Sequence, residues 1–138
     1  MAAIQKTIRH VVSTTKTAQP LAPYSKGIRV DKTLYVSGQI GLDPKTGEFS
    51  GEDVESQAKQ CMVNLGSVLE AGGSSFDKVV KTTVMMADIA DYGKINDIYA
   101  TYFPNIKPAR SAYAVAALPK NAKVEIEAIA IVGDMADE

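Results

Sequence analysis

The feature that most constrains the fold is the segment VVKTTVMMADI (79–89), which carries apolar side chains on both faces of a predicted strand. Successive side chains of a strand point to opposite faces of its sheet, so both faces around this segment have to be covered. Such strands are typical of sheets that meet helices on one side and another sheet or subunit on the other. The sequence therefore predicts a layered fold around this strand.

Patterns elsewhere in the chain predict the remaining elements. β-Branched or alternating residues between turn residues predict strands over 7–14, 27–30, 33–40, 111–118 and 123–133. Apolar positions at spacings of three and four predict helices over about 52–71 and about 92–103. The order β-β-β-α-β-α-β-β predicts an α+β fold, with one mixed sheet and both helices on a single face of it.

Local signals predict where the two helices begin and end. Ser50, followed three residues later by Asp53, resembles a capping box at the start of the first helix. Gly72 or Gly73 is predicted to supply a left-handed cap at its end. Asp91 is predicted to cap the second helix.

The sheet face away from the helices is predicted to carry apolar side chains, notably around Val84, Met86, Ile129 and Ile131. An exposed apolar area of that extent usually marks an interface between subunits. We therefore expect a homo-oligomer.

Length and composition favour a single soluble domain over residues 1–138. A chain of 138 residues can bury a core without disulfides or structural metal, and no repeat or linker divides it. No window approaches the roughly eighteen apolar positions that a membrane-spanning helix needs. The formal net charge of −1 argues against a dominant surface for binding polyanions.

The compartment is predicted from the cysteine content and from the first residues. The single cysteine, Cys61, rules out an intramolecular disulfide and suits a reducing compartment, so we expect the cytoplasm. No acidic residue precedes Asp31, and the basic and hydroxyl residues before it resemble a mitochondrial presequence. The predicted strand at 7–14 leaves only a few residues that could be removed as a presequence. The cytoplasm is therefore the first expectation, and the mitochondrion is the alternative.

The sequence contains no motif for a metal or a cofactor. It has one histidine and one cysteine, with no HExxH, CxxC, GxGxxG or P-loop pattern. His10 lies on a predicted strand, which favours a structural or surface role. Cys61 lies on the apolar stripe of the first predicted helix, which is typical of a buried, inert thiol. We therefore expect neither metal nor cofactor.

Charged side chains on two predicted strands are the candidates for chemistry. Alternation places Glu125 and Glu127 on one face of a strand. They lie either where a solvent-exposed part of that face becomes buried, or at the margin of a site shielded from bulk water, where a carboxylate orients a water molecule. Arg110 is either an edge charge that discourages aggregation or a guanidinium that binds a carboxylate. Arg110 is predicted to lie beside Glu125 on a neighbouring strand. The pair indicates a small anionic ligand with an acid/base group nearby.

Four stretches resemble one known family: APYSKG (22–27), LYVSGQIGLDPKTGE (34–48), VVKTTVMMADIADYGKINDIY (79–99) and PARSAYAVAALPKNAKVEIEAIAI (108–131). Over about residues 8–133 the chain is similar to the Rid family, also called YjgF/RidA, and most to its animal perchloric-acid-soluble, or translation-inhibitor, members. The resemblance implies a chorismate-mutase-like subunit and a homotrimer with clefts between subunits. It also implies cofactor-free hydrolysis of 2-iminobutanoate and 2-iminopropanoate to 2-keto acids and ammonia.

The resemblance also implies roles for individual residues. Arg110 would bind the substrate carboxylate, and Glu125 would position the attacking water as the acid/base group. Further substrate-binding positions implied in the cleft are Tyr24, Ser37, Asn96 and Ala112.

Ala112 departs from the family pattern. Many members carry a cysteine two residues after the arginine, where this chain has Ala112. A thiol role is therefore removed at this position, and only a contribution of the backbone groups remains. Glu127 is interpreted as structural.

Two other functions remain as alternatives. One is an endoribonuclease that cleaves messenger RNA and inhibits translation, as reported for animal members of the family. The other is a non-enzymatic trimer that binds a carboxylate ligand or acts like a chaperone. RNA binding has little support in the sequence, because the chain has a single histidine and a mildly acidic net charge.

Overall fold

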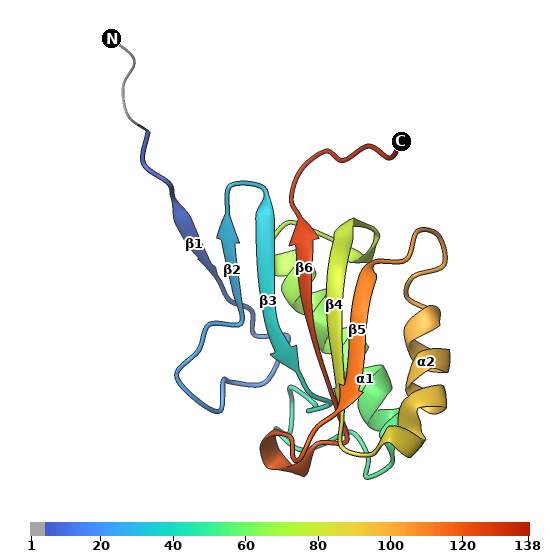
Figure 1. Ribbon diagram of the computed structural model, residues 1–138. Coiled ribbons are helices and arrows are strands. Elements are labelled where there is room, and N and C mark those ends of the chain that lie inside the picture. The colour runs from blue at the N-terminus through green and yellow to red at the C-terminus, as the bar shows by residue number, and fades with distance from the viewer. Residues whose placement is uncertain (1–4) are drawn as a thin grey trace.

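The computed structural model describes residues 5–138, which form a six-stranded sheet and two helices (Figure 1). The strands are β1 (Arg9–Val12), β2 (Gly27–Val30), β3 (Thr33–Gln39), β4 (Val79–Met86), β5 (Ala109–Ala114) and β6 (Val124–Ile131). The helices are α1 (Val54–Ala71) and α2 (Tyr92–Ala100), with single 3-10 turns at Phe76–Lys78, Ile89–Asp91 and Pro119–Asn121. The predicted order of elements is confirmed. The predicted removable N-terminal segment includes residues 1–4, which lie outside the described residues.

The sheet is mixed, with the strand order β1-β2-β3-β6-β4-β5. All neighbours pair antiparallel except β4 and β5, which are parallel and are joined through α2. A parallel pair needs such a crossover, because a tight turn cannot return the chain in the same direction. Both helices lie on one face of the sheet, as Figure 1 shows, so the predicted α+β architecture is confirmed.

The main core lies between the helices and the sheet. It includes Val84 and Met86 of β4, which are fully buried. The prediction that these two residues lie on the open sheet face is therefore wrong. The sequence of a strand with apolar residues on both faces does not show which set of side chains faces the helices. In β4, the even-numbered residues face them. The open face carries the half-buried Ile129 and Ile131, as predicted, together with the half-buried Met85 of β4.

The ends of α1 agree in part with the predicted caps. Asp53 is the N-cap, and its carboxylate accepts hydrogen bonds from the backbone nitrogen and the hydroxyl of Ser56, both at 2.9 Å. The predicted capping box with Ser50 is wrong, because Ser50 lies outside the first turn and donates to Gln60 Oε1 at 3.0 Å. Gly73 takes the left-handed conformation after the helix, with φ of 84°, as one of the two predicted alternatives.

The helix α2 begins at Tyr92 as predicted, but its capping contact and its end differ from the prediction. Asp91 occupies the N-cap position with a helical backbone, and its side chain makes no capping bond. The carboxylate of Asp88 instead accepts from Ala90 N at 2.9 Å, one turn earlier. The helix ends at Ala100 rather than near residue 103.

Strand β5 is shifted toward the N-terminus relative to the predicted strand at 111–118. It begins at Ala109, so that Arg110 lies inside it, paired with Thr82 of β4. It ends at Ala114, and Leu118 packs in a second small cluster with Ile40, Leu42 and Ala122. β5 is an edge strand, and its parallel pairing with β4 fixes the side of the sheet to which Arg110 points.

Candidate functional site

The predicted site residues form two groups on opposite faces of the sheet. Arg110 pairs with Thr82, whose side chain is buried on the helix-covered face, so Arg110 points toward the helices. Glu125 pairs with Met85 and points to the open face. Strand β4 lies between β5 and β6. The prediction that Arg110 lies beside Glu125 on a neighbouring strand is therefore wrong within one chain.

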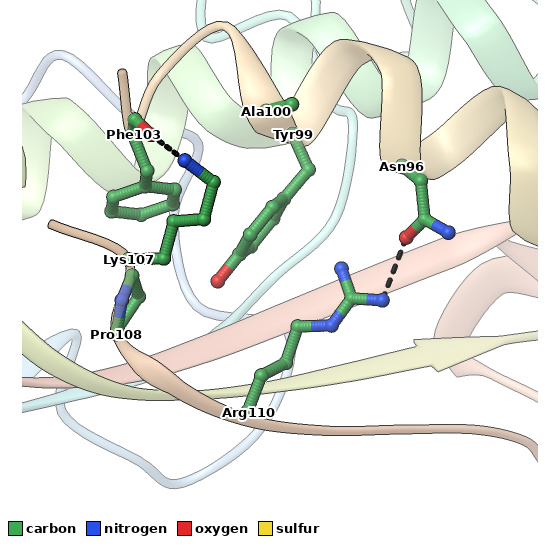
Figure 2. Close-up of a pocket in the computed structure, with 7 residues that line it drawn as sticks. All are labelled: Asn96, Tyr99, Ala100, Phe103, Lys107, Pro108 and Arg110. Carbon is green, nitrogen blue, oxygen red and sulfur yellow. Dashed lines mark hydrogen bonds between the residues drawn. The ribbon is translucent and has the colours of Figure 1, made fainter. Parts of the chain in front are cut away.

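Arg110 is held against one face of α2 (Figure 2). Its Nη2 donates to Asn96 Oδ1 at 2.6 Å and to the Tyr92 hydroxyl at 3.2 Å. Its guanidinium also lies over two aromatic rings, 5.6 Å from the centre of Tyr92 and 4.8 Å from that of Tyr99. Residues 92, 96 and 99 share one face of a helix because their spacings are four and three. The helix thus presents an amide and two rings to a single cation.

The two tyrosines that contact Arg110 have pKa values shifted in opposite directions. The hydrogen bond from Arg110, followed by one from Asn96, lowers the pKa of Tyr92. Burial raises the pKa of Tyr99, whose hydroxyl shares a buried hydrogen bond of 2.7 Å with Thr82 Oγ1. Tyr99 is therefore anchored to β4 beneath the guanidinium. Because Nε and Nη1 of Arg110 bond to no other residue within 5–138, those donors are available to an anion.

A cavity of about 310 Å³ adjoins this arginine. Figure 2 shows the Arg110 side chain at one side of it and Phe103 and Lys107 at the other, with Tyr99 between them. Asn96, Ala100 and Pro108 complete the lining. The cavity combines apolar walls with two cationic side chains, which suits a small organic anion.

The second group surrounds Glu125 on the open sheet face. A cavity of about 310 Å³ is lined there by Tyr24, Ser37, Gly38, Glu125 and Glu127, together with Leu21, Ala22, Ile40 and Pro119. The Ser37 hydroxyl donates to the backbone oxygen of Ser25 at 2.5 Å, so it joins the wall that carries Tyr24 to β3. Tyr24, Ser37 and Glu125, which were predicted to share a cleft, thus lie together.

Glu125 is a perturbed carboxyl group. Burial, and next the negative charge of Glu127, raise the pKa of Glu125 above its ordinary value. A carboxyl group of raised pKa exchanges protons closer to neutral pH, which suits general acid–base catalysis. Glu127, predicted to be structural, lines the same cavity and contributes its charge to this shift.

Gly38 allows Glu125 to lie flat against β3. A Cβ atom at residue 38 would stand 2.6 Å from Glu125 Oε2 and 2.9 Å from Glu125 Cγ. Any larger residue at position 38 would therefore displace the whole carboxyl group. The sequence indicated this position only as part of the stretch YVSGQI, without a role.

Ala112 differs from its expected role, and two tyrosines without a predicted role contact Arg110. Ala112 follows Arg110 on the helix-facing side of β5 and packs against the main core, so its side chain lines neither cavity. Tyr92 and Tyr99 had no predicted role, although their spacing from Asn96 could have revealed the group that holds Arg110.

Other candidate centres give no site among residues 5–138. No group of three His, Cys, Asp or Glu side chains there is placed to hold a metal ion. No helix in that range has the length and apolar content needed to cross a membrane. Cys61 is fully buried and burial raises its pKa strongly, so the prediction of a buried, inert thiol is confirmed.

Known proteins resemble this chain along most of its length. A mouse protein, 2-iminobutanoate/2-iminopropanoate deaminase, is 53% identical over 126 residues, which are 91% of this chain and 93% of the mouse protein. A solved structure from Entamoeba histolytica, described as a putative endoribonuclease L-PSP, is 52% identical with a TM-score of 0.88, and the match covers 91% of this chain and all of that one.

A ligand-bound structure is also among the similar proteins. TdcF from E. coli, solved with bound serine, is 35% identical with a TM-score of 0.86, and the match covers 90% of this chain and 99% of TdcF. Residues 14–132 match the family described as endoribonuclease L-PSP, and this range includes both cavities. The chain therefore belongs to the endoribonuclease L-PSP family, the Rid family that its sequence motifs resemble.

Proposed function

We propose that this protein hydrolyses small 2-imino acids, such as 2-iminobutanoate and 2-iminopropanoate, to 2-keto acids and ammonia. The identity of 53% over 91% of the chain with the mouse deaminase carries this proposal. The serine bound by TdcF is a small α-amino acid, close in size and charge to such substrates. A guanidinium with available donors and a carboxyl group of raised pKa are the parts that the reaction needs.

The proposed reaction uses Glu125 to move protons. Glu125 takes a proton from water while the water oxygen bonds to C2 of the protonated imine and the electron pair of the C=N double bond moves to nitrogen. Glu125 then returns that proton to the nitrogen of the resulting carbinolamine. The C–N bond breaks with its electron pair leaving on ammonia, the C=O bond of the keto acid forms, and the hydroxyl proton passes to the Glu125 carboxylate and from there to solvent. General acid–base catalysis of this kind contributes about 100- to 10,000-fold in rate.

Arg110 has the role of binding the substrate carboxylate. A guanidinium and a carboxylate form charge-assisted hydrogen bonds, which are shorter and stronger than neutral ones. Asn96, Tyr92 and Tyr99 hold the guanidinium in place before the substrate arrives. A pre-positioned anchor lowers the entropic cost of bringing C2 to the water and to Glu125. Tyr24 and Ser37 line the cleft on the other side of the substrate.

The proposed cleft is completed by a second copy of the chain, because Arg110 and Glu125 lie on opposite faces of one sheet. The Arg110 side chain reaches the β5 edge under α2, whereas Glu125 opens onto the uncovered face. That face also exposes Tyr35 and Tyr113, which are 49% and 47% accessible in a single chain. Burying this face against other copies would bring Arg110 of one copy to Glu125 of another. A homotrimer with three such clefts is the assembly that the family resemblance implies.

The direct test is the decay of 2-iminobutanoate generated in the cuvette by a threonine dehydratase. We expect the protein to accelerate formation of 2-ketobutanoate by about 100-fold or more over buffer, given the usual effect of acid–base catalysis. Semicarbazide, present from the start, competes with water for the imine, so faster hydrolysis is measured as a lower initial rate of semicarbazone formation. An equal rate with and without the protein would contradict the proposed function.

Gly38→Ala is expected to impair this activity without unfolding the protein. The added methyl group forces the Glu125 carboxyl group away from its position, and misplacing a catalytic group by about 1 Å can lower the rate about 100-fold. The melting temperature and kcat are measured on the same preparation. Gly93→Ala is the control, since a Cβ there meets no atom within 4 Å. A Gly38→Ala variant with the wild-type kcat would contradict the placement of Glu125.

The family description as an endoribonuclease supports a second candidate function. His10, the single histidine of the chain, is exposed on the outermost strand β1, far along the sheet from β6. A nuclease centre in either of the two cavities described above would therefore have to use other groups. RNA cleavage that persists in Arg110→Ala, with constant specific activity through purification, would support a nuclease site separate from the imine cleft.

A further inference from the structure

Residues 14–26, called here the strap, lie in the connection from β1 to β2 (Figure 1). They contribute one wall of the Glu125 cavity. Leu21, Ala22 and Tyr24 of the strap line that cavity opposite Glu125. The strap contains no helix or strand. Its place over the cavity therefore depends on individual contacts rather than on a ladder of backbone hydrogen bonds.

Lys26 closes the strap into a loop with its own side chain. Its ammonium group donates to the backbone oxygen of Thr14 at 2.6 Å and to that of Thr17 at 3.1 Å. These acceptors lie twelve and nine residues earlier in the chain. The lysine is only 6% exposed. A single buried side chain thus joins the last residues of the strap to the first.

The burial of this ammonium group opposes folding unless its contacts compensate. Burial lowers the pKa of Lys26, and no carboxylate among residues 5–138 forms an ion pair with it. A buried cation without a countercharge is unfavourable compared with an apolar side chain of similar size. What the ammonium group provides, and an apolar chain cannot, is simultaneous donation to two carbonyl groups, which fixes the geometry of the strap.

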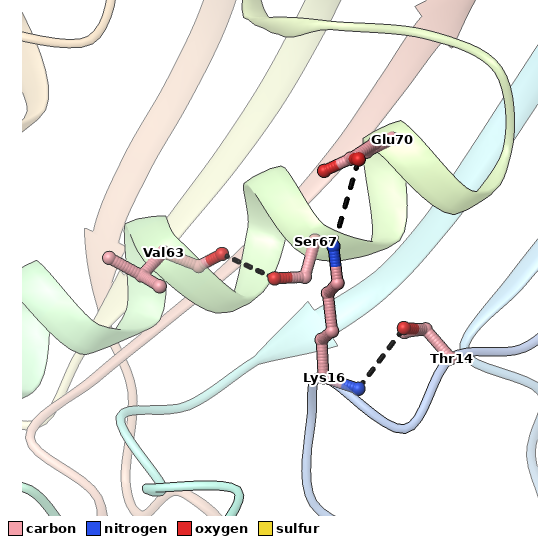
Figure 3. Close-up of polar contacts among 5 residues, drawn as sticks. All are labelled: Thr14, Lys16, Val63, Ser67 and Glu70. Carbon is pink, nitrogen blue, oxygen red and sulfur yellow. Dashed lines mark hydrogen bonds and ion pairs between the residues drawn. The ribbon is translucent and has the colours of Figure 1, made fainter.

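A second side-chain contact of the strap is weaker. Figure 3 shows Lys16 reaching from the strap to Glu70 on α1, where Lys16 Nζ lies 3.7 Å from Glu70 Oε1. The two side chains are 65% and 74% exposed. Ion pairs so open to water contribute little, because solvent screens the charges and two long side chains lose freedom. Lys26 is therefore the stronger candidate for holding this part of the strap.

The end of the strap is fixed to the cavity floor by β3. Ser37 donates from its hydroxyl to the oxygen of Ser25 and from its backbone nitrogen to the oxygen of Lys26, the latter at 3.0 Å. Lys26 thus connects two parts of the strap: the end bonded to β3 and the start beside α1. Tyr24 lies in the segment held between these two attachments.

We propose that Lys26 is a positioning residue, which holds the strap so that Tyr24, Ala22 and Leu21 form a preorganised wall of the substrate cleft. This role rests on the proposed imine hydrolysis, because the wall is assigned to that substrate. Lys26 does not touch the reacting atoms and takes no part in proton transfer. Its loss should weaken substrate binding while the chemical step is preserved.

The test compares Lys26→Met with Lys16→Met, which removes the exposed lysine of the same strap. For Lys26→Met we expect KM for 2-iminobutanoate to rise about fivefold or more, with kcat within about twofold of the wild-type value. This pattern indicates the loss of a binding interaction that is equally strong in the ground state and in the transition state. Amide hydrogen exchange of residues 14–24 should accelerate, while that of α1 stays unchanged. Lys16→Met should match the wild type in KM and in exchange. Lys26→Arg, which keeps a cation with several donors, should restore KM at least in part.

Two results would overturn the proposal. One is wild-type exchange of residues 14–24 in Lys26→Met, which would mean that the lysine does not hold the strap. The other is accelerated exchange with an unchanged KM, which would mean that the strap does not shape the cleft. Exchange is measured without substrate, so it separates these results from a failure of imine hydrolysis itself. If Lys26→Met does not fold, Lys26→Gln, which retains one amide donor group, replaces it in the same comparison.

Discussion

Replacing Arg110 with alanine is expected to lower kcat/KM for 2-iminobutanoate by about 100- to 1,000-fold, the usual loss when one partner of a desolvated charge pair is truncated. The guanidinium is the cation that Asn96, Tyr92 and Tyr99 hold in place, and it keeps donors available for a carboxylate. Most of the loss should appear in KM, with a further decrease in kcat because an unanchored substrate meets the water in many orientations.

Arg110→Lys separates the charge from the geometry. A lysine keeps the positive charge but lacks the planar fork, and it stacks less well between two rings. We expect Arg110→Lys to recover only a small part of the activity. The control is Lys94→Ala, which removes a cation from the same helix where it pairs with Glu55 at the exposed surface, 3.8 Å away. Wild-type kcat/KM in Arg110→Ala would contradict the assigned role of Arg110.

The architecture of this chain could be predicted because its signals are local. Alternation in residues 124–131 and the three-and-four spacing in α1 are fixed by neighbouring residues, and both elements form where expected. The face of β4 could not be predicted in the same way. Apolar residues occur in both of its sets of side chains, Val84 with Met86 in one and Met85 in the other, so apolarity alone does not decide which set meets the helices, and only Lys81 in the second set favours the open face. That choice depends on how α1 packs on the sheet.

The site was harder to predict, because strand order is not a local property. β6 is last in the sequence but enters the sheet between β3 and β4, which leaves β5 at the edge. Arg110 and Glu125 are thereby separated by one strand and by the thickness of the sheet. By contrast, the alignment of Asn96 with Tyr92 and Tyr99 follows directly from helical spacing. Family resemblance implied which residues form the site, and only the fold revealed that Arg110 and Glu125 lie on opposite faces of one sheet.

Glu125→Gln is expected to lower kcat by about 100- to 10,000-fold, because glutamine cannot accept the proton from water. In the wild type, the carboxylate form has to be present for the water to be activated. The rate should therefore increase with pH through the raised pKa of Glu125, above the range of an ordinary glutamate. The variant should lose this pH dependence, which pH–rate profiles of kcat at saturating substrate can measure.

Mixing the two inactive variants tests whether each cleft is shared between copies. If Arg110 comes from one chain and Glu125 from another, random assembly of equal amounts of Arg110→Ala and Glu125→Gln leaves about one cleft in four with both native residues. About a quarter of the wild-type kcat/KM should then return after the variants are unfolded and refolded together, whereas each variant refolded alone should keep its own low kcat/KM. Clefts built within single chains would give no recovery, because every chain carries one defect. Since Arg110 and Glu125 lie on opposite faces of one sheet, recovery is the expected result.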